Sequence, residues 1–359
     1  MFKNVAIGIL TARVLICADF DWNLPEGFPR PPVPVDNPMT AAKVELGRYL
    51  FYDKRISVNR KESCGSCHRQ ELAFTDGRAH AEGTTGELHP RSSMSLANVA
   101  YVPFLTWANP KLTSLEEQAL IPMLGDAPVE LGLKGREQEF LGVLRGDPIY
   151  QRLFPRAFAE DSERYTLGQV TKAIAAFERT IISMRSPYDR YRWGGESSAV
   201  SDAAKRGEII FFSSERGGCF QCHAGWNFGS AIRFAGGKDG DNVSGFFNTG
   251  VSTYEEPNRG LYEQTKRMED IGKFRAPSLR NIAVTAPYMH DGGLTTLDEV
   301  VDHYASGGKK QHPNKSRILR PLSLTSEDKR DLIDFLKSLT DDALLHDPRW
   351  SDPWPPKAH

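Results

Sequence analysis

Apolar side chains recur at helical spacing in two stretches of the chain. The first stripe comprises Val170, Ile174, Phe177 and Ile181, and the second comprises Leu332, Phe335, Leu336 and Leu339. This spacing predicts two amphipathic helices, each with one face against a core. Thr325 and Asp328 have the spacing of a capping box, which predicts that the second helix begins there. No strand-rich stretch of useful length is present, so the pattern predicts a mainly α fold.

The segments before these helices repeat along the chain. Gly47-Arg-Tyr-Leu-Phe51 is matched by Gly207-Glu-Ile-Ile-Phe211, and Ser95-Leu-Ala-Asn98 is matched by Ser278-Leu-Arg-Asn281. Each copy closes with one amphipathic helix, so the sequence predicts two domains of one kind in tandem. The glycine in each opening segment would let the closing helix cross it at close backbone approach.

The repeat and the composition together predict the domain boundaries. Two domains are expected at residues 40–190 and 191–345, with a tail at 346–359. Residues 19–39 contain six prolines between Pro25 and Pro38, which predicts an extended arm. Glycines mixed with aromatic residues predict a short hairpin within Phe228–Ser252.

Each repeat contains a Cys-x-x-Cys-His signature. These are Cys64-Gly-Ser-Cys67-His68 and Cys219-Phe-Gln-Cys222-His223. In this signature both thiols form thioether bonds to a haem, and the histidine becomes an axial iron ligand. A thioredoxin-like redox pair or half of a zinc site are the alternatives, but no further Cys or His stands at ligand spacing near either pair. The sequence therefore predicts two cytochrome c-like domains, each with one covalently bound haem c.

The charge balance and the N-terminal segment indicate which partners and which cell compartment to expect for this protein. Lysine and arginine number 45 against 46 acidic residues, so neither nucleic acid nor an anionic membrane is a favoured partner. Residues 1–18 are predicted to be a leader, with Lys3 ahead of an apolar run too short to span a bilayer. A lipoprotein cleavage site before Cys17 is a weaker alternative. Covalent haem attachment takes place outside the bacterial cytoplasm, so we expect a periplasmic protein.

Further motifs resemble those of the bacterial di-haem cytochrome c peroxidase and MauG superfamily. Besides both signatures, they are Ala73-Phe-Thr-Asp76, Pro277-Ser-Leu-Arg-Asn281 and Ala286-Pro-Tyr-Met-His-Asp-Gly292. The resemblance spans about residues 40–340. It implies that the N-terminal haem reacts with hydrogen peroxide, while the C-terminal haem stores or relays oxidising equivalents.

The resemblance also implies a peroxide pocket. Gln118 and Glu130 would lie over the open face of the first haem, and Pro122 would shape the pocket and exclude bulky ligands. Glu130 would move a proton between the peroxide oxygens as a general acid–base. Without the family, both glutamate and glutamine would be interpreted as ordinary solvated helix residues. Trp107 corresponds to the tryptophan that lies between the haems and can carry an electron hole.

The second axial ligand of the C-terminal haem separates the subfamilies. Peroxidases use methionine there and MauG-like members use tyrosine, and the matching position is Tyr304. A phenolate lowers the potential and would favour storage of two equivalents as a bis-Fe(IV) pair. His303 and Met289 are the rival ligands, and His290 is expected to be structural.

Many relatives hold a calcium ion between the haems. Thr285 and Pro287 match its carbonyl donors, but Ser92 stands where relatives use an asparagine side chain. A hydroxyl is a weaker oxygen ligand than an amide, so the serine weakens the predicted calcium site.

Three segments look most similar to MbnH-type di-haem enzymes. They are Phe20–Pro29, Leu105–Pro110 and Val129–Gly132. Such enzymes oxidise a tryptophan of the partner protein MbnP to kynurenine and so create a copper-binding site, and the resemblance implies this activity. MauG itself passes holes through a tryptophan two residues before the second signature, but Gly217 stands there, and Trp226 is a candidate exit residue.

Two other functions remain open from the sequence. One is a cytochrome c peroxidase that reduces hydrogen peroxide with electrons from a small donor protein. The other is a non-catalytic di-haem electron carrier, which needs a sixth ligand on both irons. Only Met123 offers that ligand near the first haem.

Overall fold

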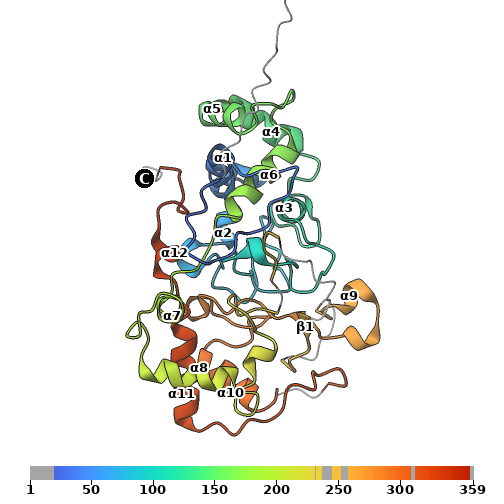
Figure 1. Ribbon diagram of the computed structural model, residues 1–359. Helices are drawn as coiled ribbons and strands as arrows, with labels where there is room; N and C mark the ends of the chain where they lie inside the picture. The colour runs from blue at the N-terminus through green and yellow to red at the C-terminus, as the bar shows by residue number, and fades with distance from the viewer. Residues whose placement is uncertain (1–19, 231, 237–244, 252–257, 309–311, 356–359) are drawn as a thin grey trace, which may run out of the picture.

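The computed structural model describes residues 20–230, 232–236, 245–251, 258–308 and 312–355. The predicted leader at 1–18 lies outside these residues. The described chain is mainly helical, as the sequence predicts, and forms two lobes stacked along one axis (Figure 1). The first lobe contains α1 (Ala41–Tyr52), α2 (Cys64–Cys67), α3 (Leu115–Leu124), α4 (Glu137–Gly146), α5 (Pro148–Ala157) and α6 (Leu167–Glu178).

The second lobe follows a short connecting helix, α7 (Pro187–Arg192). It contains α8 (Asp202–Phe212), α9 (Tyr262–Thr265), α10 (Leu297–Ala305) and α11 (Ser326–Lys337), and α12 (Asp342–His346) comes last in the chain. No helix in the described part of the chain is long and apolar enough to cross a membrane.

Both predicted amphipathic helices form and bury their apolar stripes. Val170, Ile174 and Phe177 lie on α6 and are almost fully buried, as are Leu332, Phe335 and Leu336 on α11. Thr325 caps α11: its hydroxyl accepts the Asp328 N–H at 3.1 Å, and Asp328 accepts the Thr325 N–H at 3.0 Å. The capping box predicted from the sequence is confirmed.

Each lobe is built on one helix crossing at a glycine. A Cβ atom on Gly47 of α1 would lie 1.9 Å from the Ala173 carbonyl oxygen of α6. A Cβ atom on Gly207 of α8 would lie 2.0 Å from the Asp331 carbonyl oxygen of α11. Only a residue without a side chain permits this backbone approach. The close crossing predicted from the repeat is confirmed in both lobes.

The described residues of Phe228–Ser252 contain one strand, and its partner lies outside the range of the predicted hairpin. Strand β1 (Phe246–Phe247) pairs antiparallel with β2 (Phe274–Arg275), which lies beyond that range. Phe246 and Phe274 are both buried where the two lobes approach, so tertiary packing selects the partner strand. Residues 231, 237–244 and 252 of the predicted range lie outside the described residues.

The arm and the tail both pack on the body. Tyr101 donates a hydrogen bond to the Pro29 carbonyl of the arm at 2.7 Å. The tail returns to the first lobe, where the buried Trp350 donates its indole N–H to the Thr180 carbonyl at 2.9 Å. Tyr52 donates to the Trp350 carbonyl at 2.6 Å.

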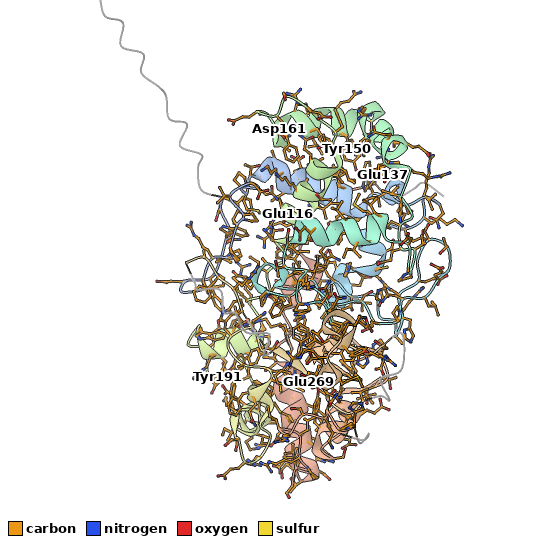
Figure 2. All side chains as sticks on the ribbon, turned by 90° about the vertical axis from the view of Figure 1, so that its right-hand side faces the viewer. Glu116, Glu137, Tyr150, Asp161, Tyr191 and Glu269 are labelled. Carbon is orange, nitrogen blue, oxygen red and sulfur yellow. The ribbon has the colours of Figure 1, made fainter. Side chains whose placement is uncertain are left out.

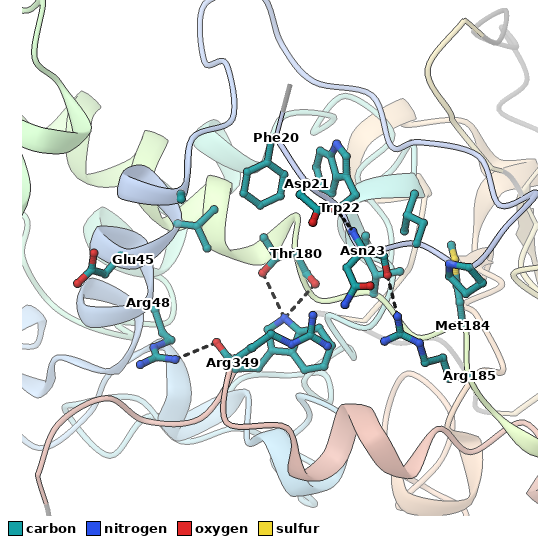
Figure 3. A pocket seen from close by; sticks show the side chains of 16 residues that line it. Phe20, Asp21, Trp22, Asn23, Glu45, Arg48, Thr180, Met184, Arg185 and Arg349 are labelled. Atoms are coloured by element: carbon teal, nitrogen blue, oxygen red, sulfur yellow. Dashed lines mark hydrogen bonds between the residues drawn. The ribbon is translucent and has the colours of Figure 1, made fainter. Parts of the chain in front are cut away.

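A cavity lies where arm, tail and first lobe meet. Phe20 and Trp22 of the arm line it together with Arg48 of α1, Arg185 and Arg349 (Figure 3). It contains neither of the Cys-x-x-Cys-His signatures, so it is separate from the candidate haem sites.

Candidate active site

The first signature forms one short helix and the residue that ends it. Cys64 and Cys67 are the first and last residues of α2, and His68 follows as its C-cap. The Nδ1 atom of His68 lies 2.8 Å from the Phe74 carbonyl oxygen. Phe74 has a φ of 62°, in the left-handed region, which turns its carbonyl toward the ring. Donation from Nδ1 leaves Nε2 with its lone pair available to a metal.

The second signature begins with a single 3-10 turn, Cys219–Gln221, and its histidine makes the same kind of backbone contact as His68. His223 follows Cys222, and its Nδ1 atom lies 3.0 Å from the Pro277 carbonyl oxygen and 3.2 Å from that of Phe228. Phe228 also has a positive φ, 49°. Phe74 and Phe228 therefore have the same role in the two lobes: each orients the adjacent axial histidine.

The chemistry of both donor sets fits covalent haem c. Each histidine lines one cavity with its two cysteines. Burial lowers the pKa of His68 and of His223, which keeps both imidazoles neutral as metal ligation requires. In the described ranges, no group of three or more His, Cys, Asp or Glu side chains has the arrangement that a zinc site needs. Two thiols and a neutral imidazole match haem attachment.

The first cavity brings together the side chains predicted for peroxide chemistry. Gln118 and Pro122 of α3 line it with Glu130 and His68. Glu130 reaches this position because its segment is tied to the end of α3: the Leu131 N–H donates to the Pro122 carbonyl at 2.9 Å. A proline at position 122 cannot donate to the carbonyl of Gln118, so the helical hydrogen bond between them is absent.

Burial gives the first cavity two weakly acidic carboxyl groups. Removal from water raises the pKa of Glu130 to about 7. The same effect raises the pKa of Glu178, at the end of α6, to about 8. Such groups exchange protons near neutral pH, which is the property that a general acid–base needs.

A buried ion pair lies beside these carboxyl groups. Glu116, labelled in Figure 2 in the first lobe, lies 2.8 Å from the buried Arg179. Burial by itself would raise the pKa of Glu116, but the hydrogen bond and charge of Arg179 outweigh it and lower that pKa to about 2. Glu116 is therefore ionised at neutral pH and anchors α3 to the end of α6.

Sequence reasoning missed two residues of this cavity. Glu178 lines the cavity and follows Ile174 by four residues, so it lies on the apolar face of the helix. A charged residue on an apolar helix face is a sequence signal that could have identified it. His89 also lines the cavity, from a loop without periodic pattern. Met123, the sixth ligand considered from the sequence, is buried in the core of the first lobe.

The second cavity contains Tyr304 together with His223. Tyr304 comes from α10, and Met289 and His290 also line this cavity. The Nε2 atom of His303 lies 2.9 Å from the Thr249 carbonyl oxygen, which engages that nitrogen. The ring of His290 stacks on Phe274 with centroids 3.7 Å apart, and burial lowers its pKa to about 4.

Trp107 lies at the junction of the two lobes. Its ring lines the second cavity, and its indole N–H donates to the Ser92 carbonyl at 2.9 Å. The Ser92 N–H donates in turn to the His290 carbonyl at 3.0 Å. His89, three residues before Ser92, lines the first cavity. The loop from 89 to 92 therefore joins the two cavities beside this indole.

The residues predicted for calcium lie near the same junction. The Ser92 hydroxyl donates to the Met289 carbonyl at 3.1 Å, and the Thr285 hydroxyl donates to the Ile282 carbonyl at 3.3 Å. Pro287 is half-buried. Calcium binding at Ser92, Thr285 and Pro287 stays a prediction.

The position two residues before the second signature has no room for a side chain. A Cβ atom on Gly217 would lie 2.4 Å from the Ile210 carbonyl oxygen of α8. Trp226, after His223, is half-buried and packs edge-on against Tyr101 at 4.8 Å between ring centroids. A route through position 217 is therefore absent from this protein.

Residues 41–197 match the family model described as di-haem cytochrome c peroxidase. The chain is 37% identical to cytochrome-c peroxidase IdrP1 of Denitromonas iodatirespirans, over 96% of this chain and 95% of that protein. This chain belongs to the di-haem cytochrome c peroxidase and MauG family. It is therefore an oxidoreductase of the di-haem type, which removes the non-catalytic carrier as an alternative.

Other relatives come from the MauG branch of the family. The methylamine utilization protein MauG of Methylorubrum extorquens is 34% identical, over 88% of this chain and 82% of that protein. A crystal structure of a MauG-like protein associated with microbial copper homeostasis is 43% identical, with a TM-score of 0.89. That similarity covers 94% of this chain and 100% of the other.

Proposed function

We propose that this protein is a periplasmic di-haem enzyme that uses hydrogen peroxide to oxidise a partner protein. The target is a tryptophan of an MbnP-like copper-binding protein, which is converted to kynurenine. Support comes from the resemblance to MbnH-type enzymes and from the 43% identity to a MauG-like protein associated with copper homeostasis.

The observation that carries the proposal is the contrast between the two cavities. His68 lines the first cavity together with Gln118, Pro122 and Glu130, and His223 lines the second together with Tyr304. Bound haem supplies the redox centre at each histidine. Glu130 would take a proton from one peroxide oxygen and return it to the other, and Pro122 would limit the space in this cavity. The Tyr304 oxygen, as a phenolate, stabilises the oxidised second haem.

The partner experiment tests this function directly. The holoenzyme is mixed with an MbnP-like protein and hydrogen peroxide, and the partner is digested and analysed by mass spectrometry. We expect kynurenine at one tryptophan, with none formed when catalase is added first. A partner that stays unmodified while the haems react with peroxide would refute this substrate.

Tyr304→His tests the assignment of the second axial ligand. We expect both haems to remain attached, because the cysteines are unchanged, and the near-infrared band of the two-haem oxidised state to be lost. Met289→Leu is the matched control at the rival position and should keep the band. Loss of the band in the control but not in Tyr304→His would transfer the ligand role to Met289.

A cytochrome c peroxidase that takes electrons from a small donor protein is the second candidate. His89 in the first cavity favours it, because an imidazole is a haem axial ligand and lines the same cavity as His68. The 37% identity to cytochrome-c peroxidase IdrP1 supports it as well. Peroxide is added to the fully oxidised enzyme: immediate reaction supports the MauG-like function, and a need for prior reduction supports the peroxidase.

A further inference from the structure

Trp193 is the most exposed tryptophan of the chain. It caps the C-terminus of α7, and 49% of its surface is open to solvent. All six tryptophans of the sequence lie in the described residues, and the other five are buried or half-buried. The helix is found at the edge of the molecule in Figure 1, and Tyr191 on it is labelled in Figure 2.

Packed aromatic rings connect Trp193 with the second haem site. Its ring lies 5.9 Å from that of Tyr188, and the Tyr188 ring lies 5.5 Å from that of Phe228, both between centroids. The Phe228 carbonyl is one of the two acceptors near Nδ1 of His223. The surface indole is therefore joined to the axial histidine through one tyrosine and one phenylalanine.

Tyr188 has the environment of a redox-active tyrosine. It is 4% exposed, and its hydroxyl donates to Oε1 of Glu208 at 2.7 Å. Burial and this hydrogen bond raise the pKa of the phenol. A phenol loses an electron readily only when its proton can leave at the same time, and the Glu208 carboxylate is placed to take that proton.

We propose that Tyr188 and Trp193 form the route by which oxidising equivalents leave the second haem, and that the partner protein docks its target side chain over Trp193. This inference rests on the proposed function and identifies the face of the enzyme that the partner meets. The partner must present an oxidisable aromatic side chain at or near its own surface.

Each pass along the route moves one electron. With haem bound at His223, Tyr188 would supply an electron to that site, and its hydroxyl proton would move to Glu208. Trp193 then reduces the tyrosyl radical, and the proton returns from Glu208 to the phenol oxygen. An electron from the partner's aromatic side chain restores Trp193. Two passes consume the two oxidising equivalents that one hydrogen peroxide molecule supplies as it is reduced to two water molecules. Conversion of a tryptophan to kynurenine is a four-electron oxidation followed by hydrolytic loss of formate, so it takes four passes and two peroxide molecules, with water supplying the added oxygen atoms.

The Trp226 alternative is weaker because Trp226 is less exposed than Trp193. The guanidinium of the buried Arg280 lies 5.6 Å from the Trp226 ring centroid and donates to the Trp226 carbonyl. The buried Asp189 pairs with this guanidinium at 2.8 Å, so the ion pair holds the Trp226 segment in place. Trp226 is half-buried, whereas 49% of the Trp193 surface is open to solvent, so Trp193 offers the larger surface to a partner.

The test uses the holoenzyme without any partner. After addition of hydrogen peroxide, peptide mapping by mass spectrometry measures oxygen addition at each tryptophan, while absorption spectra follow the haems. We expect oxygen addition at Trp193 in the wild type and a several-fold loss of it in Tyr188→Phe. Glu208→Gln keeps the aromatic contacts but removes the proton acceptor, so it should also reduce the labelling. Trp354, half-buried on the first lobe, is the internal control and should be labelled equally in all variants.

Four results would overturn the route. Haems that react normally while Trp193 stays unmodified would exclude it as the exit and leave the proposed function intact. Equal labelling of Trp193 in wild type, Tyr188→Phe and Glu208→Gln would exclude the tyrosine as relay. Loss of labelling in Trp226→Phe but not in Tyr188→Phe would move the route to Trp226. Haems that do not react with peroxide would refute the proposed function and this inference with it.

Discussion

Among single residues, Glu130 and Glu178 of the first cavity differ in charge from Glu116, which lies beside that cavity, because their surroundings differ. Glu116 is ionised because Arg179 pairs with it, and burial holds Glu130 and Glu178 near the midpoint of their titration at neutral pH. The same type of side chain therefore has two roles: Glu116 holds α3 to the end of α6, whereas Glu130 and Glu178 can exchange protons.

Glu130→Gln should slow the reaction with peroxide by roughly 10²–10⁴-fold, the usual loss on removing a general acid–base. Stopped-flow absorption of the haems measures the rate. The wild-type rate should fall as the pH drops below about 7, because the base becomes protonated, and the variant should lose this dependence. Glu117→Gln, an exposed neighbour on α3, is the control with unchanged rate. Equal rates in wild type and Glu130→Gln would remove Glu130 from the mechanism.

Glu178→Gln should change how stability depends on pH. The folded state binds the Glu178 proton more tightly than the unfolded chain, since the pKa rises from 4.5 to about 8. Its stabilising contribution is therefore complete below pH 4.5 and is lost as the pH rises to about 8. The variant should match the wild type at low pH and be more stable above pH 8, by up to a few kcal/mol, since one pKa unit is about 1.4 kcal/mol. Thermal unfolding across this range measures it, and parallel curves would contradict the assignment.

Among the elements, two helix crossings at glycine set the frame of both lobes. Each crossing fixes the opening helix against the closing helix, and the signature that follows the opening helix is thereby placed against the core. Similar opening helices in the two lobes are each followed by one Cys-x-x-Cys-His signature, and in each lobe the Nδ1 atom of the signature histidine lies near a backbone carbonyl.

Gly47→Ala and Gly207→Ala should each destabilise their lobe. The added methyl group would lie about 2 Å from a backbone oxygen, so the helices must separate, at a cost of about 1–3 kcal/mol or more. Gly142→Ala in α4 is the control, because nothing lies within 4 Å of its Cβ position. There the substitution should stabilise the helix by roughly 0.5–1 kcal/mol. Chemical denaturation distinguishes the three variants, and equal effects would refute the crossing argument.

At the scale of the whole molecule, the C-terminal tail ties the end of the chain to the first lobe. Besides Trp350, the side chain of Gln70 donates to the Leu344 and Asp347 carbonyls, both at 2.9 Å. The first lobe is therefore completed by residues that follow the second lobe in the sequence.

Trp350→Ala should destabilise the first lobe although it lies at the far end of the chain. Removal of a buried aromatic ring of this size costs about 3–5 kcal/mol. Ile209→Ala, at a position that is 63% exposed, is the control and should change stability by no more than about 0.5 kcal/mol. Hydrogen exchange should locate the loss of protection in α1 and α6. Loss confined to the second lobe would contradict the packing described here.

Much of the architecture was predictable because it depends on spacing along the chain. Cys-x-x-Cys-His implies haem attachment within five consecutive residues, and the apolar stripes need only the period of a helix. The capping box and the crossing glycines are equally local. The pairing of β1 with β2 was not predictable, because the partner strand is chosen by packing between the lobes.

The sequence by itself determined the helical class, the repeat, both haem signatures and, through motif resemblance, the family. The resemblance also implied that Gln118 and Glu130 share a pocket, but only the tertiary structure added Glu178 and His89 to it, because these residues come from separate segments. The tertiary structure also decided the raised pKa values, which depend on burial, and the contact of Trp193 with Tyr188, which depends on how α7 lies on the second lobe. Motif spacing and helical periodicity depend on residues close together in the sequence. Burial and side-chain contacts depend on segments that are far apart in the sequence and come together only in the fold.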